Sequence, residues 1–204
     1  MKKIISISTG SSARDHTTRH VFLGQECELS RIGTDGDLDK AIQMYRDLDG
    51  KVDAFGVGGS EFFLRVGKRR YYFREIKRIR QAVKISKIGD GNGVKGILER
   101  RAFQALEKYL NKNENKSLKG LLALQTTAVD RYGMAEAMVD SGLAVTFGDF
   151  MFSLGLPFAI RRLFTVRLLA AILLPIITQV PYAWLYPLGA KQDKPPEPKW
   201  QPYY

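Results

Sequence analysis

Short runs of alternating apolar and polar residues dominate the first part of the chain, and they predict β-strands that end at glycine turns. The expected strands cover residues 3–9, 18–23, 27–32, 52–57, 62–66 and 71–73. Apolar residues at helical spacing between Ala41 and Leu48 predict a helix that ends at Gly50. The preceding Asp37 belongs to a segment suited to capping that helix. Strands that alternate with helices indicate an α/β protein.

The middle of the chain continues this alternation. Ile76, Ile79 and Val83 form the apolar face of an amphipathic helix, and a glycine-rich segment leads into a second helix over residues 97–110. A polar connection over 111–119 is followed by an expected strand, helix and strand over residues 121–129, 131–141 and 143–147. Such a strand–helix–strand unit is the repeating element of a parallel sheet. We therefore predict a Rossmann-like α/β fold with a mainly parallel sheet, a hairpin-decorated N-terminal portion and a helical C-terminal segment.

The charge pattern changes after Arg161. Residues 168–190 contain no charged side chain and are long enough to cross a bilayer, but three prolines, the first being Pro175, interrupt them. We favour a buried or partner-facing helix there over a transmembrane span. The proline-rich, aromatic residues 195–204 predict either a tail that wraps a partner or a chain truncated within a longer protein. The predicted domains are residues 1–115, 116–160 and 161–204.

The residue counts and the N-terminal residues limit which sites and signals the chain can contain. The single cysteine, Cys27, excludes an internal disulfide, and with only two histidines we expect no metal site. The apolar run at the start is too short for a secretory signal, so we expect a cytoplasmic protein.

The net charge of +11 is concentrated in one stretch, since residues 61–101 contain 13 basic and 4 acidic side chains. A basic stripe of this kind attracts phosphates, nucleic acid or an acidic membrane surface. The alternative is a solvated helix face and a charged hairpin edge.

A G-x-G-x-x-G run formed by Gly91, Gly93 and Gly96 stands directly before a predicted helix. Glycines in this position let the backbone approach a pyrophosphate, and the helix N-terminus supplies free N–H groups. Lys95 adds a cation within the run. These four residues are the predicted phosphate contacts, and a glycine-rich turn without a ligand is the alternative.

Three charged residues mark the ends of the predicted strands at 121–129 and 143–147. Asp130 and Arg131 follow the first strand and Asp149 follows the second, in the place where open α/β sheets bind ligands. Arg131 is suited to hold a carboxylate or a phosphate, and Asp149 to reach a ribose hydroxyl. Asp130 is the candidate catalytic base, because burial raises the pKa of a carboxyl group. Capping and turn formation are the alternative roles.

Several distinctive stretches extend over nearly the whole chain. They include Ile32-Gly33-Thr34-Asp35-Gly36-Asp37, Asp90-Gly91-Asn92-Gly93, Val129-Asp130-Arg131-Tyr132-Gly133-Met134-Ala135-Glu136 and Trp184-Leu185-Tyr186-Pro187. In these stretches the chain resembles a family of bacterial, mainly clostridial, proteins named quinate 5-dehydrogenase. The resemblance implies a Rossmann-like oxidoreductase that oxidises a cyclic hydroxy acid with NAD or NADP. It also implies a lysine–aspartate pair beside the reacting hydroxyl, which the sequence does not locate.

Two functions are therefore expected. The first is a nucleotide-binding dehydrogenase that binds a small anionic or phosphate-bearing ligand. The second is a non-enzymatic binding or assembly module that uses the basic face and the apolar C-terminal arm. Homo-oligomerisation through the C-terminal segment is a further expectation, and we favour these partners over nucleic acid or a membrane. Peripheral attachment to a membrane through residues 168–188 is the third alternative.

Overall fold

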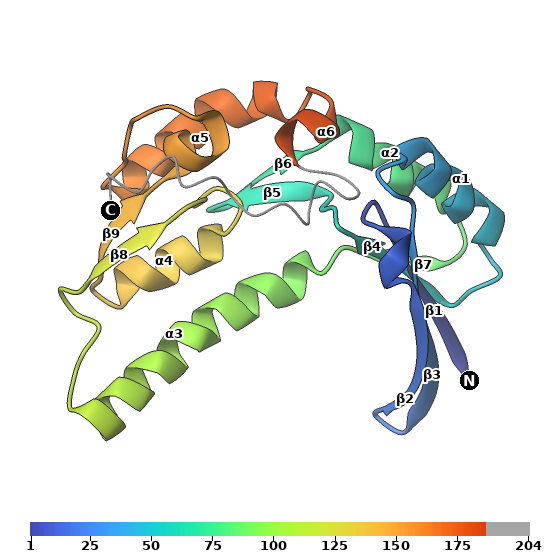
Figure 1. The fold of residues 1–204 in the computed structure, drawn as a ribbon, viewed down its shortest axis with the longest axis horizontal. Helices are drawn as coiled ribbons and strands as arrows, with labels where there is room; N and C mark the ends of the chain where they lie inside the picture. The colour runs from blue at the N-terminus through green and yellow to red at the C-terminus, as the bar shows by residue number, and fades with distance from the viewer. Residues whose placement is uncertain (187–204) are drawn as a thin grey trace. The chain divides into compact units, whose positions relative to one another are not determined.

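A computed structural model describes residues 1–186 of the chain (Figure 1). The expectations for the tail over 195–204 lie outside the described residues. By their contacts, the described residues form two compact units. The first unit contains Met1–Phe63, Tyr72–Asn92 and residues 178–186, and the second contains Leu64–Tyr71 and Gly93–Ile177. A boundary thus falls between Asn92 and Gly93, whereas the sequence placed one after residue 115.

The first unit is built on a five-stranded, mostly parallel sheet. Its strands are β1 (Lys2–Ser8), β2 (His16–Phe22), β3 (Gln25–Gly33), β4 (Ala54–Gly58) and β7 (Lys87–Gly89), in the order β2-β3-β1-β4-β7. Strand β1 pairs in parallel with β3 and β4, and β4 pairs in parallel with β7. The edge strand β2 is antiparallel because it forms a hairpin with β3. The expected α/β architecture with a mainly parallel sheet is confirmed.

Helix α1 (Leu38–Leu48) packs on β1 and against α2 (Arg74–Ala82). The unit also contains the short α6 (Tyr182–Leu185), whose Tyr182 ring contacts Phe73, and a 3₁₀ turn η1 (Ser12–Arg14) after β1. The Asp37 side chain caps α1 by accepting a hydrogen bond from the Lys40 N–H at 2.8 Å, as expected. Tyr45 of α1 is fully buried, and its hydroxyl lies within hydrogen-bond distance of the carbonyl oxygens of Ile7 and Gly56. This contact ties the helix to β1 and β4.

The second unit contains the expected strand–helix–strand unit. Its elements are the hairpin β5 (Phe63–Val66) and β6 (Arg69–Tyr72), then α3 (Asn92–Glu114), β8 (Leu122–Gln125), α4 (Tyr132–Asp140), β9 (Ala144–Phe147), the π-helical turn η2 (Asp149–Ser153) and α5 (Leu163–Ile177). Strands β8 and β9 are parallel and are joined through α4, as Figure 1 shows. Helix α5 packs against α4.

Two boundaries differ from the expected ones for local reasons. Helix α3 begins at Asn92, five residues earlier than expected, because the Asp90 carboxylate accepts hydrogen bonds from the backbone and side-chain amides of Asn92. Strand β8 ends early, at Gln125, because the side-chain amide of Gln125 donates to the carbonyls of Thr127 and Arg131. These bonds fold the following residues into a loop.

Helix α5 passes through Pro175, which lies two residues before its end. Among the described residues, no helix combines the length and the apolar character needed to cross a membrane.

Candidate site at the carboxyl ends of β8 and β9

The predicted residues of the second unit gather where its two parallel strands end. Asp130 and Arg131 lie in the loop between β8 and α4, and Asp149 begins the turn that follows β9. Gln125, the last residue of β8, is opposite Phe147, the last residue of β9. Parallel strands in register place their carboxyl ends at one edge, which is where α/β sheets bind ligands.

Helix α3 brings Lys95 to this edge. The Nζ atom of Lys95 lies 3.5 Å from Oδ2 of Asp130, and Nε of Arg131 lies 3.7 Å from the same oxygen. The side chains of Lys95 and Asp130 are 16% and 25% exposed, so solvent weakens this ion pair less than one on the open surface. Lys95 and Asp130 thus form an ion pair that the sequence analysis did not predict.

Glu99 is a member of the site that the sequence analysis missed. It is the buried residue of α3, and its Oε1 lies 3.2 Å from a guanidinium nitrogen of Arg131. Its Oε2 accepts a hydrogen bond from the Met134 N–H in the first turn of α4. The carboxylate therefore occupies the N-terminus of α4, where the helix dipole favours a negative charge. The sequence contains a signal for Glu99. It follows Lys95 by four residues, and residues at this spacing lie on one face of a helix that begins at Asn92.

A close approach of two helices makes this contact possible. A Cβ atom placed on Gly133 would lie 3.1 Å from Oε2 of Glu99 and 3.5 Å from the Cα atom of Gly96. Glycine at position 133 thus leaves room for the Glu99 carboxylate at the start of α4.

Asp149 is a largely buried carboxyl group of the site. Its Oδ1 accepts a hydrogen bond from the Val129 N–H at 2.9 Å, whereas its Oδ2 is buried without a hydrogen-bond partner among the described residues. Burial raises the pKa of Asp149, the hydrogen bond from Val129 opposes this shift, and the negative charge of Asp130 adds to it. Oε1 of Gln125 is a second buried acceptor without a partner in the described part of the chain.

These groups form an arrangement suited to acid–base chemistry. Burial raises the pKa of Asp149, while Asp130 is ion-paired with Lys95. Two neighbouring carboxyl groups in different environments are a common basis for separate acid and base roles.

The glycine run lies at the start of α3, with the strand–turn–helix context that was expected. Gly91 has a φ of +78°, and a Cβ placed on it would meet no described heavy atom within 4 Å. The Asp90 carboxylate, however, accepts hydrogen bonds from the N–H groups of Asn92 and Phe62. The N–H group of Asn92 is therefore paired with a negative charge of the chain itself. The assignment of the glycine run to a pyrophosphate of NAD or NADP stays a prediction.

The first unit has a comparable edge at the carboxyl ends of β1, β3 and β4. Its polar groups bond mainly to one another: Asp15 accepts from the Gly33 N–H and Arg31, and Asp35 accepts from the Ser12 N–H. The Ser60 hydroxyl, after β4, is buried without a hydrogen-bond partner among the described residues. This edge is largely closed by its own side chains.

No group of three or more histidine, cysteine, aspartate or glutamate side chains suited to a metal ion occurs in residues 1–186. The exposed His16 of β2 lies at hydrogen-bond distance from the Arg14 carbonyl.

Comparison with family models also places a boundary near residue 92, although residues 64–71 fall within the first match and residues 178–186 within the second. Residues 3–90 match a model described as a domain of unknown function, DUF8753, and residues 93–204 match another such domain, DUF8754. The second match covers more than half of the chain, which therefore belongs to the DUF8754 family. No curated protein and no solved structure matches the chain significantly.

Proposed function

We propose that the second unit binds a small hydroxylated acid at the carboxyl ends of β8 and β9 and removes a proton from one of its hydroxyl groups. The observation that carries this proposal is the shielded ion pair between Lys95 and Asp130. Such a pair is what the resemblance to quinate 5-dehydrogenases implies beside the reacting hydroxyl.

Asp130 is the proposed base. Its Oδ2 would accept the hydroxyl proton, and Lys95, 3.5 Å from that oxygen, would stabilise the negative charge that develops on the substrate oxygen. Arg131 would attract the ligand's acidic group, although Glu99 shares its charge.

This proposal places the protein among Rossmann-like oxidoreductases that act on a cyclic hydroxy acid. A nicotinamide cofactor would receive the hydride in such a reaction.

Thermal melting of the full chain with quinate, shikimate and other cyclic hydroxy acids at millimolar concentration tests the proposal. A ligand at a hundred times its Kd should add about 2.7 kcal/mol of stability. Parallel melts with NAD, NADH, NADP and NADPH test the cofactor expectation separately.

Three variants test whether the Lys95–Asp130 pair is responsible for the shift in melting temperature. Asp130→Asn and Lys95→Met should abolish the shift caused by the hydroxy acid, whereas Lys108→Met on the exposed part of α3 should retain it. Far-ultraviolet circular dichroism confirms that each variant is folded. The proposal is wrong if no hydroxy acid shifts the melting temperature, or if the Asp130→Asn variant responds as the wild type does.

A further inference from the structure

Helix α5 of the second unit is apolar on two opposite sides. Three of its residues at four-residue spacing are buried: Val166, Ala170 and Leu174. A second series with the same spacing is exposed: Phe164 at 73%, Leu168 at 50%, Ile172 at 59% and Ile176 at 67%. The two series are offset by two residues, which turns them to opposite faces of a helix with 3.6 residues per turn.

The exposed series is a continuous stripe rather than a set of isolated side chains. Single exposed apolar residues are normal on a protein surface, but a contiguous row of large ones marks an interaction site. A helix that is apolar all round normally has both sides covered. The rest of the unit covers one face of α5, so the stripe needs an apolar partner of its own.

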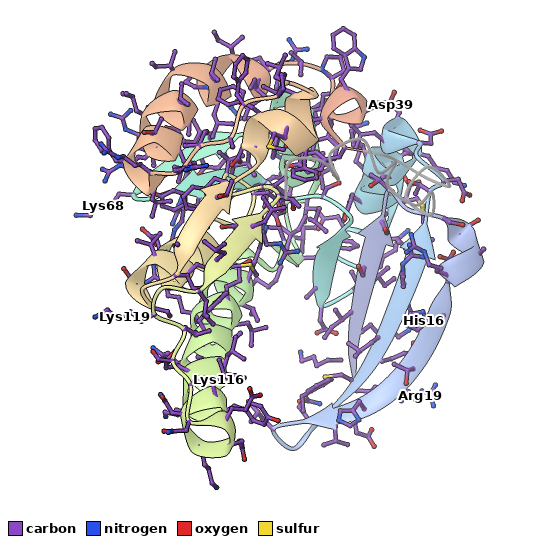
Figure 2. All side chains as sticks on the ribbon, turned by 60° about the vertical axis from the view of Figure 1, so that its left-hand side comes forward. His16, Arg19, Asp39, Lys68, Lys116 and Lys119 are labelled. Atoms are coloured by element: carbon purple, nitrogen blue, oxygen red, sulfur yellow. The ribbon has the colours of Figure 1, made fainter. Side chains whose placement is uncertain are left out.

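Basic side chains lie near the N-terminal end of this stripe. Arg161 and Arg162 directly precede α5, Arg167 lies within it, and all three are exposed. The turn of the β5–β6 hairpin lies beside the helix, since a Cβ atom placed on Gly67 would be 3.7 Å from Nε of Arg167. The hairpin contributes four more exposed basic residues: Arg65, Lys68, Arg69 and Arg70. Figure 2 shows Lys68 extending away from the ribbon.

Acidic residues are absent from the corresponding part of the sequence. Residues 150–186 contain no aspartate or glutamate, although the chain has 21 of them in all. The segment that carries the stripe therefore contributes basic but no acidic side chains of its own. Two copies of this face would bring arginines and net positive charge together, which disfavours self-association.

We propose that the exposed stripe of α5 and the basic β5–β6 hairpin bind the surface of a membrane that contains anionic phospholipids. The apolar side chains enter the boundary between headgroups and acyl chains, while the arginines and Lys68 contact lipid phosphates. The helix lies along the surface, because its 15 residues span only about 22 Å, less than a hydrocarbon core of about 30 Å. This surface is independent of the Lys95–Asp130 site proposed above.

Sedimentation of the full chain with vesicles tests this proposal. Vesicles of phosphatidylcholine with 30% phosphatidylglycerol should bind the protein, and pure phosphatidylcholine should bind it at least tenfold more weakly. Higher salt should weaken binding to the anionic vesicles, because screening reduces the attraction between the basic side chains and the lipid.

Two double variants separate the apolar and the basic contributions. Leu168→Glu with Ile172→Glu should abolish sedimentation with anionic vesicles. Lys68→Gln with Arg69→Gln should weaken it roughly 25-fold, about fivefold for each basic residue near the surface. The matched control is Val21→Glu with Leu23→Glu, which adds the same charge to exposed apolar positions of the β2–β3 hairpin, and it should bind about as the wild type does.

Three results would overturn the proposal. The first is equal binding to neutral and anionic vesicles, and the second is unchanged binding of the Leu168→Glu, Ile172→Glu variant. The third is wild-type protein that does not bind vesicles and is dimeric in light scattering, while the Leu168→Glu, Ile172→Glu variant is monomeric. A second copy of the chain would then cover the stripe. Circular dichroism confirms that the variants are folded.

Discussion

Replacement of Gly33 by alanine tests whether the edge of the first unit is as closed as its contacts indicate. Gly33 ends β3, and its N–H donates to the Asp15 carboxylate at 2.6 Å. A Cβ atom at this position would lie 2.6 Å from backbone atoms of Ser11 and Ser12. Ordinary contacts begin near 3.4 Å, so the two segments must separate by about 0.8 Å. Backbone atoms cannot rotate out of the way as a flexible side chain would.

The expected cost follows from this geometry. Overpacking of this kind costs about 1–3 kcal/mol, and weakening the hydrogen bond between Gly33 and Asp15 adds about 1 kcal/mol. A total of about 3 kcal/mol should lower the melting temperature by roughly 6–12 °C in a chain of this length. Thermal melting and urea denaturation followed by circular dichroism measure both quantities.

Gly89→Ala is the matched control, because Gly89 also ends a strand and a Cβ atom there would meet no described heavy atom within 4 Å. That variant should be unchanged or more stable by up to about 1 kcal/mol. If the free energy of unfolding of the Gly33→Ala variant differs from that of the wild type by less than about 0.5 kcal/mol, the segment after β1 is not held against β3 as described.

Three further predictions concern buried or hydrogen-bonded polar groups. Ser60→Ala should raise the free energy of unfolding by about 1 kcal/mol in urea titrations, because it removes a buried hydroxyl that has no hydrogen-bond partner among the described residues. A loss of stability would instead mean that the hydroxyl forms a hydrogen bond. Asp149→Asn should be more stable than the wild type at neutral pH, because the raised pKa of Asp149 makes the wild type lose stability as pH rises through it. That gain should vanish below the ordinary aspartate pKa of about 3.9, and a gain independent of pH would contradict this account. Asp49 accepts hydrogen bonds from the N–H groups of Ser86, Lys84 and Ile85, and these bonds lower its pKa. Asp49→Ala should therefore destabilise the protein at neutral pH, and the loss of stability should shrink as acid protonates Asp49. Urea titrations at pH 7 and pH 3 measure this difference, and an equal loss at both pH values would contradict the prediction.

Most secondary structure followed from short segments of sequence, because its causes are local. The β2–β3 hairpin was predicted from two alternating runs around Gly24, and the start of α1 from the capping residue Asp37. The β8–α4–β9 unit was likewise expected, although β8 proved shorter. Its end depends on the Gln125 side chain reaching the Arg131 carbonyl, a contact that no periodicity reveals.

The candidate site shows the same division between local and long-range causes. The sequence placed Asp130, Arg131 and Asp149 at strand ends, because such positions can be read from the strands themselves. It assigned Lys95 to a phosphate turn, whereas the structure pairs it with Asp130, 35 residues away along the chain.

By itself, the sequence determined the alternation of strands and helices, the mainly parallel character expected of the sheet, and the concentration of positive charge. Only the tertiary structure decided that Glu99 is buried at the start of α4, that α5 leaves one apolar face exposed, and that a boundary between the units follows Asn92. The reason is physical: propensities, caps and periodicity act over a few residues. The burial of a charge or the exposure of an apolar face depends on which distant segments pack against it.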